Sequence, residues 1–144
     1  MPDIDFYSES INAPQDKIIA ALLDFEHYPE WQSLVLACTV KERDDEGRGT
    51  FVEMYVDAKV KKIRYTTRYF YDLDNGRLGF DLVEGDLRAC RGRYRLAAQA
   101  DGSTVVSIDV TTDVGFFIPG PIKKLIRDQS LRNSMRDLRL RVGG

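Results

Sequence analysis

Residues 11–31 read INAPQDKIIAALLDFEHYPEW, and this stretch holds the signals for two helical pieces. After Asn12, apolar residues recur at helical spacing, which predicts a helix with Asn12 as its N-cap and Gln15 in capping-box position. Asp24 is then expected to cap a second, very short helical turn. A longer continuation is unfavourable, because Pro29 disfavours helical geometry in the residue before it.

From residue 34 the apolar period changes from helical spacing to a spacing of two, which is typical of strands with one buried face. Six alternating segments follow, separated by turn signals such as DDEGRG at residues 44–49 and DNG at residues 74–76. Consecutive strands joined by short turns predict an antiparallel meander. The predicted inward positions include Leu34, Leu36, Cys38 and Val40 in the first of these strands and Ile63, Tyr65, Thr67, Tyr69 and Tyr71 in the third.

The last segment predicts one long helix over residues 119–141, because Pro119 and Pro121 suit a helix start and Gly143 suits a helix end. Its apolar residues fall on two nearly opposite faces, so the helix is expected to be covered on two sides or kinked. One face carries Ile122, Leu125, Ile126, Gln129 and Asn133, and the other carries Leu131, Met135, Leu138 and Val142.

A sheet with a single apolar face must cover that face, and the long helix is the obvious cover. The sequence therefore predicts an α+β fold with a curved antiparallel sheet of about seven strands wrapped round a long C-terminal helix. Two short helices are expected after the first strand. A curved sheet that grips one helix tends to leave a cavity, which is the default site for an apolar small molecule.

Length, composition and charge limit the function classes. The 144 residues, 43% of them hydrophobic and 31% charged, are expected to form one domain over residues 1–144. The formal net charge of −2 argues against a nucleic-acid binder. No apolar run reaches the ~20 residues of a membrane span, and the start MPDIDFYSES lacks the features of a signal peptide, so the cytoplasm is the expected location.

The cysteines and the single histidine leave little room for a metal site or for nucleophilic catalysis. Cys38 and Cys90 lie far apart without C-x-x-C spacing, and a disulfide is not expected in a reducing compartment. A structural zinc site would lack ligands, and a Ser-His-Asp or Cys-His site would have to use His27. We predict no metal and no cofactor.

Three segments resemble the START-like (SRPBCC) superfamily, which has the helix-grip fold, and within it the bacterial polyketide cyclase/dehydrase and coenzyme Q-binding branch. They are residues 11–31, LRACRGRYRLAAQADGSTVVSIDV at residues 87–110, and IPGPIKKLI at residues 118–126. The resemblance covers essentially the whole chain and implies a START-like ligand-binding domain. Members of the superfamily bind sterols, lipids, quinones, polyketides and plant hormones, and a minority are enzymes, so the motifs specify the fold better than the chemistry.

In the family form, DFEHYPEW at residues 24–31 links the first helix to the second strand at one edge of the cavity. The resemblance implies that Trp31 walls off that edge. The alternative is that Trp31 plugs the end of the core and touches no ligand. His27 is interpreted as a surface residue, because one histidine without a placed partner is a weak catalytic signal.

Residues on the predicted inner face are the candidate ligand contacts. Tyr65, Tyr69 and Tyr94 share the parity of the apolar face, so their hydroxyls are expected either in the cavity or at the sheet edge. Gln129 is a candidate polar contact from the helix, with a solvent-facing position as the alternative. The predicted ligand-binding set is Trp31, Met54, Tyr65, Tyr69, Phe80, Tyr94, Ile126 and Gln129.

Two functions fit such a cavity: a carrier or chaperone of a lipid, quinone or polyketide-like molecule, and a cyclase or dehydratase acting on a poly-keto substrate. A titratable group on the inner face would favour the enzyme. Glu9 is the candidate, because it points inward if Ile11 does, and burial makes a carboxylate a usable general acid or base near neutral pH. The competing register places Ile4 and Phe6 inside and leaves Glu9 solvated.

The arginines of the strands have the opposite parity from the apolar stripe and are expected on the outer face of the sheet. There they either pair with acidic residues across strands or offer a surface for transient contact with an anionic membrane or an acidic partner. A docking module in a toxin–antitoxin or stress system is the third hypothesis, and the oligomeric state is left open. The arginines are Arg64, Arg68, Arg91, Arg93 and Arg95, and the expected acidic partners are Glu53, Asp57, Asp81 and Asp109.

Overall fold

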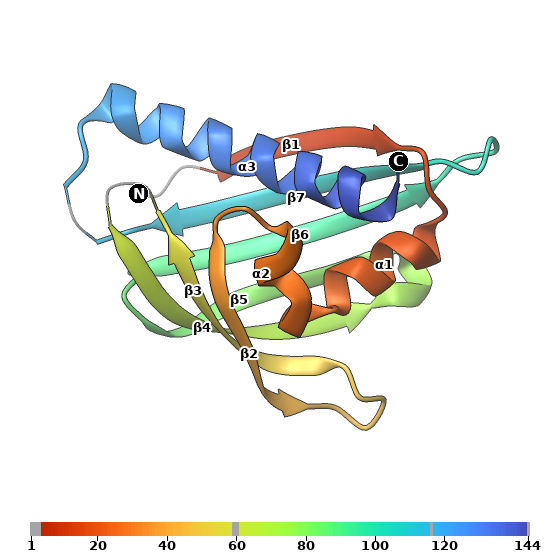
Figure 1. The fold of residues 1–144 in the computed structure, drawn as a ribbon, viewed down its shortest axis with the longest axis horizontal. Helices are drawn as coiled ribbons and strands as arrows, with labels where there is room; N and C mark the ends of the chain where they lie inside the picture. Colours follow the sequence, from red (N-terminus) through yellow and green to blue (C-terminus); the bar gives the residue numbers. More distant parts are fainter. Residues whose placement is uncertain (1–3, 59–60, 116, 144) are drawn as a thin grey trace.

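The computed structural model describes residues 4–58, 61–115 and 117–143. Its strands form one seven-stranded antiparallel sheet in the order β1-β7-β6-β5-β4-β3-β2 (Figure 1). From β2 to β7, each strand pairs with the next one along the chain. The first strand, β1, pairs with the last, β7. The strands are β1 (Ile4–Ile11), β2 (Val35–Arg43), β3 (Gly49–Asp57), β4 (Lys62–Asp72), β5 (Arg77–Gly85), β6 (Ala89–Ala98) and β7 (Thr104–Asp113).

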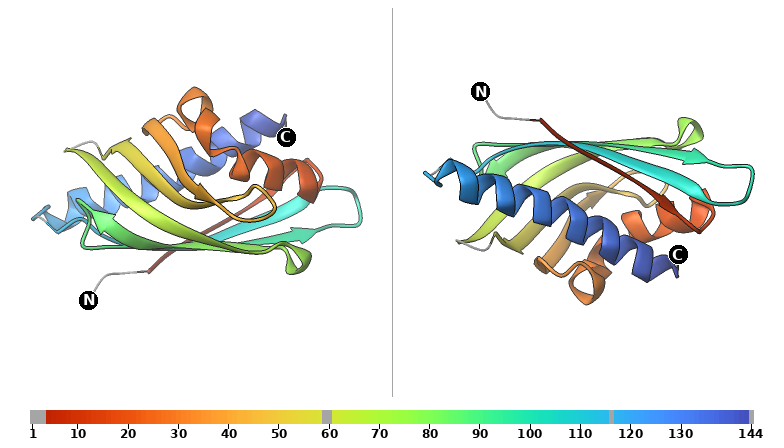
Figure 2. Two further views of the ribbon diagram at one scale, coloured as in Figure 1. Left: turned by 90° about the horizontal axis from the view of Figure 1, so that it is seen from below. Right: turned by 90° about the horizontal axis from the view of Figure 1, so that it is seen from above.

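The helices are α1 (Gln15–Leu23), the 3-10 turn η1 (Phe25–His27), α2 (Tyr28–Trp31), the 3-10 turn η2 (Leu73–Asn75) and the long α3 (Gly120–Val142). Figure 2 shows α3 lying across one face of the curved sheet, with α1 and α2 beside its C-terminal half. The predicted helix-grip arrangement is confirmed, and α3 differs from the predicted residues 119–141 by one residue at each end.

The start of α1 differs from its prediction. Pro14 occupies the N-cap position in an extended conformation, and no side chain caps the helix, so the assignment of Asn12 as N-cap is wrong. The physical reason lies at the preceding residue. Ala13 is buried, and its carbonyl oxygen accepts a hydrogen bond of 2.9 Å from the Thr104 hydroxyl on β7. This anchor keeps the chain extended until it has left the sheet.

Strand β2 departs from strict alternation at its beginning. A register shift between Val35 and Ala37 marks a β-bulge against β3. Because an extra residue reverses the side-chain alternation, Leu36 is 43% exposed and its predicted inward position is wrong. Val35 packs against the core in its place, and Cys38 and Val40 follow the prediction.

The two apolar faces of α3 are covered unequally, whereas the sequence predicted a helix covered on both sides or kinked. Met135, Leu138 and Val142 are buried in the core, whereas Ile122 and Leu125 remain 48% and 61% exposed. Hydrogen bonds to Ser33, beside α2, also hold the C-terminal half of α3. The backbone N–H and the hydroxyl of Ser33 donate to the buried Asp137 carboxylate at 2.8 and 2.7 Å. The helix is therefore anchored at its C-terminal half.

The outer face of the sheet carries arginine–carboxylate pairs at Glu53 and Asp81, two of the four expected acidic partners. Arg64 lies 3.1 Å from Glu53 and Arg93 lies 3.0 Å from Asp81. Exposed pairs of this kind contribute little stability each, about 0–1 kcal/mol. Within the described ranges, no helix is long and apolar enough to cross a membrane, and no three potential metal ligands come together.

Candidate ligand-binding cavity

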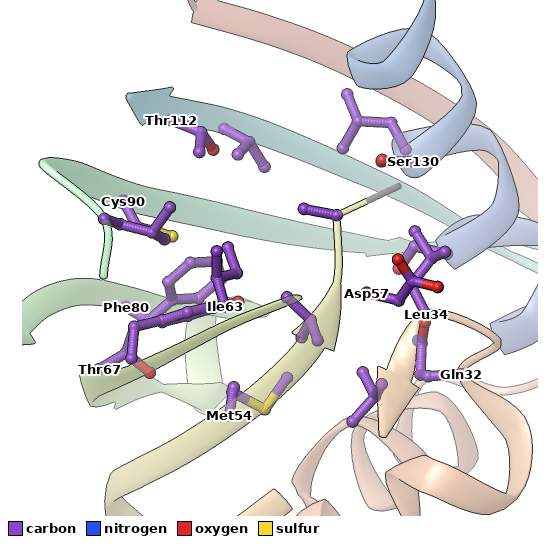
Figure 3. Close-up of a pocket in the computed structure, with 18 of the residues that line it drawn as sticks. Gln32, Leu34, Met54, Asp57, Ile63, Thr67, Phe80, Cys90, Thr112 and Ser130 are labelled. Atoms are coloured by element: carbon purple, nitrogen blue, oxygen red, sulfur yellow. The ribbon is translucent and has the colours of Figure 1, made fainter. Parts of the chain in front are cut away.

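A cavity of about 280 Å³ lies between the concave face of the sheet and α3 (Figure 3). This volume is close to the lower end of the ~300–1,000 Å³ typical of small-molecule sites. Strands β3 to β7 supply most of the wall, with further residues from α2, its link to β2, and one face of α3. The lining comprises Asp5, Tyr28, Gln32, Leu34, Val35, Met54, Val56, Asp57, Ala58, Ile63, Tyr65, Thr67, Tyr69, Phe80, Leu87, Cys90, Tyr94, Val110, Thr112, Val114, Ile126, Ser130, Leu131 and Ser134.

The shape of the sheet wall depends on one glycine. Phe80 on β5 pairs with Gly92 on β6, and a Cβ at Gly92 would lie 2.3 Å from the tip of the Phe80 ring. The ring therefore lies flat across β6 in space that any other residue would occupy. Phe80 also contacts Tyr69, with ring centroids 5.2 Å apart, so one layer of aromatic side chains covers this part of the wall.

Three tyrosine hydroxyls give the cavity its neutral polar groups. Burial raises the pKa of Tyr94 to about 12 and raises the pKa values of Tyr65 and Tyr69 well above their ordinary value. All three are therefore protonated at neutral pH and can donate a hydrogen bond. Among the residues that the structure describes, none accepts or donates a hydrogen bond to these hydroxyls. They are available to a bound molecule.

Thr67 is the most deeply buried polar residue of the lining. Its side chain is 1% exposed, and its hydroxyl oxygen has no hydrogen-bond partner within the described ranges. In Figure 3 it lies on the sheet wall with Met54 and Ile63, across the cavity from Gln32 and Ser130. A buried hydroxyl without a partner is costly, so this position is unusual for a threonine.

Comparison with protein-family models finds one match, described as "Polyketide cyclase / dehydrase and lipid transport", over residues 6–143. The chain belongs to this family. The family resemblance read from the sequence is thereby confirmed. No curated protein sequence gives a significant match to this family member.

Solved structures of the same fold are numerous. A START superfamily protein from Mycobacterium smegmatis superposes with a TM-score of 0.87 at 23% identity, covering 97% of both chains. A protein from Thermus thermophilus has a TM-score of 0.82 at 22% identity, again over 97% of both chains. The Zhui aromatase/cyclase from Streptomyces sp. R1128 has a TM-score of 0.80 at 14% identity, over 99% of this chain and 94% of its own. At these identities the likeness shows the fold alone.

Of the predicted ligand-binding residues of this polyketide cyclase/dehydrase family member, the structure brings six together on the cavity wall. Gln129 is exposed on α3 and lies outside the lining, where Ser130 and Ser134 are the polar residues of the helix. Contact of the lining residues with a ligand stays a prediction. The six are Met54, Tyr65, Tyr69, Phe80, Tyr94 and Ile126.

Trp31 also lies outside the lining. Its ring packs edge-on against Tyr28 with centroids 5.1 Å apart, and Tyr28 itself lines the cavity. The hydroxyl of Tyr28 donates to the carbonyl oxygen of Leu22, which fixes α2 against α1. Trp31 packs against the buried core, and its role in closing the end of the core stays a prediction. Trp31 supports the cavity wall from behind.

His27 is exposed in the turn between α1 and α2. Its Nδ1 lies 2.6 Å from an Asp24 carboxylate oxygen, and this hydrogen bond, with the charges of Asp24 and Glu30, raises the pKa of the imidazole. The pairing joins the two ends of the turn between α1 and α2. The interpretation of His27 as a surface residue agrees with this position.

Glu9 adopts the inward register, on the same side of β1 as the buried Ile11, but it is not part of the cavity lining. Its carboxylate lies 3.1 Å from the Arg139 guanidinium on α3, so a cation faces it in place of an apolar wall. Within the described ranges, the carboxylates that reach the cavity are those of Asp5 and Asp57. Asp5 has the same parity along β1 as Glu9, so the sequence contained a signal for its inward position. Asp57 lines the cavity too, and its predicted position on the outer face is wrong.

Proposed function

We propose that this chain binds a neutral, mainly apolar small molecule in the cavity between the sheet and α3 and acts as its carrier or chaperone in the cytoplasm. The whole chain would serve as one ligand-binding domain. The observation that carries this proposal is the cavity of about 280 Å³ with mainly apolar walls and a few neutral hydroxyls. The two cysteines are free thiols, which suits a reducing compartment.

The charges around the cavity favour an uncharged ligand. Among the lining residues that the structure describes there is no lysine, arginine or histidine, and the only ionisable carboxyl groups are those of Asp5 and Asp57. A carboxylate placed inside would lose its hydration without gaining a cationic partner from the described lining residues, which is strongly unfavourable. A ketone or ester would meet only neutral donors.

We therefore expect decan-2-one to bind at least tenfold more tightly than decanoate, a difference of about 1.4 kcal/mol or more. Isothermal titration calorimetry or ligand-observed NMR at neutral pH would measure both dissociation constants. Methyl decanoate is the control, because esterification removes the charge from the same chain, and it should bind like the ketone. Equal or tighter binding of decanoate would contradict the proposed ligand class, and failure of all three to bind would contradict the cavity-binding function.

A cyclase or dehydratase using the same cavity is the second candidate, favoured by the carboxylates at the cavity and by the tyrosine donors. Asp5 or Asp57 would remove a proton from a poly-ketone, and a tyrosine hydroxyl would stabilise the resulting enolate oxygen. The activity to measure is aldol closure of heptane-2,4,6-trione to orcinol with release of one water. If the enzyme hypothesis holds, Asp5→Asn with Asp57→Asn should lower this rate about 100-fold and leave decan-2-one binding intact. No conversion by the unaltered protein favours the carrier.

A further inference from the structure

We propose that Thr67 is a ligand-anchoring residue, and that the natural ligand carries a carbonyl or hydroxyl oxygen that hydrogen-bonds to it inside an otherwise apolar part of the cavity. This inference rests on the proposed binding function and narrows its ligand class. A purely hydrocarbon ligand would leave the anchor unused.

The first argument is the unpartnered hydroxyl itself. Thr67 is 1% exposed and its Oγ1 has no hydrogen-bond partner among the described residues. Thr104 provides the contrast within the same sheet. It is equally buried, and its Oγ1 donates to the Ala13 carbonyl oxygen at 2.9 Å. Buried hydroxyls in folded proteins are nearly always partnered, so the exception at a cavity wall points to a partner supplied from the cavity.

The second argument is that the cross-strand neighbours of Thr67 offer no hydrogen-bonding side chain. Its cross-strand neighbours are Val52 on β3 and Leu82 on β5, both of them apolar. Valine has the same branched shape and a higher apolar content, and it would satisfy the packing of this position without an unpartnered polar atom. A threonine here is explained by an interaction that valine cannot make.

The third argument is the local backbone. The register of β4 against β5 shifts between Thr66 and Thr67, because Thr66 pairs with Glu84 and Thr67 pairs with Leu82. The extra residue on β5 is Val83, which is 50% exposed on the outside. Bulges of this kind re-aim side chains and are frequent beside binding sites. This one interrupts the regular ladder at the position of the unpartnered hydroxyl.

The fourth argument is that three tyrosine hydroxyls lie on the same cavity wall as Thr67. Tyr65 and Tyr69 lie two residues before and after it on the same inward face, and Tyr94 reaches the same cavity from β6. All three hydroxyls are neutral donors without partners in the described part of the chain. A compact ligand with one or two oxygens could therefore bond to Thr67 and a tyrosine together, while its rings contact Met54 and Phe80.

The experiment compares Thr67→Val with Thr104→Val, and 1-tetralone with tetralin, two bicyclic probes that differ by one carbonyl group. In Thr67→Val, we expect the urea midpoint of unfolding to stay unchanged or rise, because a buried unpartnered hydroxyl is removed. The affinity for 1-tetralone should fall about 5- to 10-fold, and that for tetralin should be unchanged or higher. Thr104→Val should lower the urea midpoint and leave the ratio of the two affinities as it is in the unaltered protein.

Each other outcome is decisive. If Thr67→Val lowers the midpoint as Thr104→Val does, the hydroxyl has an internal partner and the anchor is refuted. If both probes bind and the affinity ratio is the same in Thr67→Val, Thr67 does not contact the carbonyl, although binding in the cavity stands. If neither probe nor decan-2-one binds the unaltered protein, the proposed function itself fails. Thr67→Ser, which keeps the hydroxyl, should retain the preference for 1-tetralone.

Discussion

Replacement of Phe25 by alanine is expected to lower the free energy of unfolding by about 3–5 kcal/mol, the range observed when a fully buried aromatic residue is truncated. Phe25 is 1% exposed. Its ring contacts Tyr69 edge-on with centroids 4.7 Å apart and Tyr28 with centroids 5.4 Å apart. The ring also lies over Gly49, where a Cβ would come within 2.9 Å of it. The cavity left by alanine would border two residues that line the ligand site.

Urea denaturation followed by circular dichroism would measure this loss. Phe6→Ala is the matched control, because Phe6 is 64% exposed on β1 and its truncation should change stability by about 0.5 kcal/mol or less. A loss below about 1 kcal/mol for Phe25→Ala would show that the turn after α1 is not part of the cooperative core. The same variant should also weaken binding of decan-2-one, because Tyr28 and Tyr69 lose their common support.

The second large effect concerns the cavity. Val56→Trp is expected to weaken binding of decan-2-one at least tenfold, or about 1.4 kcal/mol, because Val56 lines the cavity and an indole there would occupy much of its space. Stability should fall by less than about 2 kcal/mol, since the new ring enters empty volume and does not compress a packed region. Binding would be measured by calorimetry and stability by urea unfolding of the same preparation.

Leu36→Trp is the control for this substitution, because Leu36 is 43% exposed on β2 and does not line the cavity. It adds the same side chain to the same sheet and should leave binding unchanged. Binding that survives in Val56→Trp would mean that the ligand site lies elsewhere. Loss of binding in both variants would instead indicate a general disturbance of the sheet.

The sequence predicted the architecture closely because the relevant signals are local. Strand alternation, the DNG turn at residues 74–76 and the prolines at the start of α3 act on neighbouring residues, so they can be read without knowing what lies across the core. The errors occurred where a distant contact decides the local structure. A bulge in β2 against β3 turned the side chain of Leu36 from the predicted inner face to the outer face. The hydrogen bond from Thr104 to the Ala13 carbonyl oxygen keeps the chain extended past Asn12, so α1 starts later than predicted.

The candidate site was predicted in part, for a related reason. Parity along a strand tells which face a side chain occupies, and it correctly placed Tyr65, Tyr69 and Tyr94 towards the interior. Parity does not show how much of the inner face of the sheet is covered by α3. Parity left Glu9 with two possible registers, one inward and one solvated, and only the packing of α3 placed Arg139 in front of it. The rotation of α3 likewise decided that Ser130 faces the cavity and Gln129 the solvent.

By itself, the sequence determined the order of the elements, the inward stripe of β3 to β7 and the family, because each depends on spacing along the chain. Only the tertiary structure decided which inward residues border empty space and which are packed against other side chains. Thr67 illustrates the difference. Its inward position follows from alternation, but its missing hydrogen-bond partner depends on every element that surrounds it. Hydrogen bonds and cavities are properties of groups brought together by folding, and spacing along one strand carries no record of them.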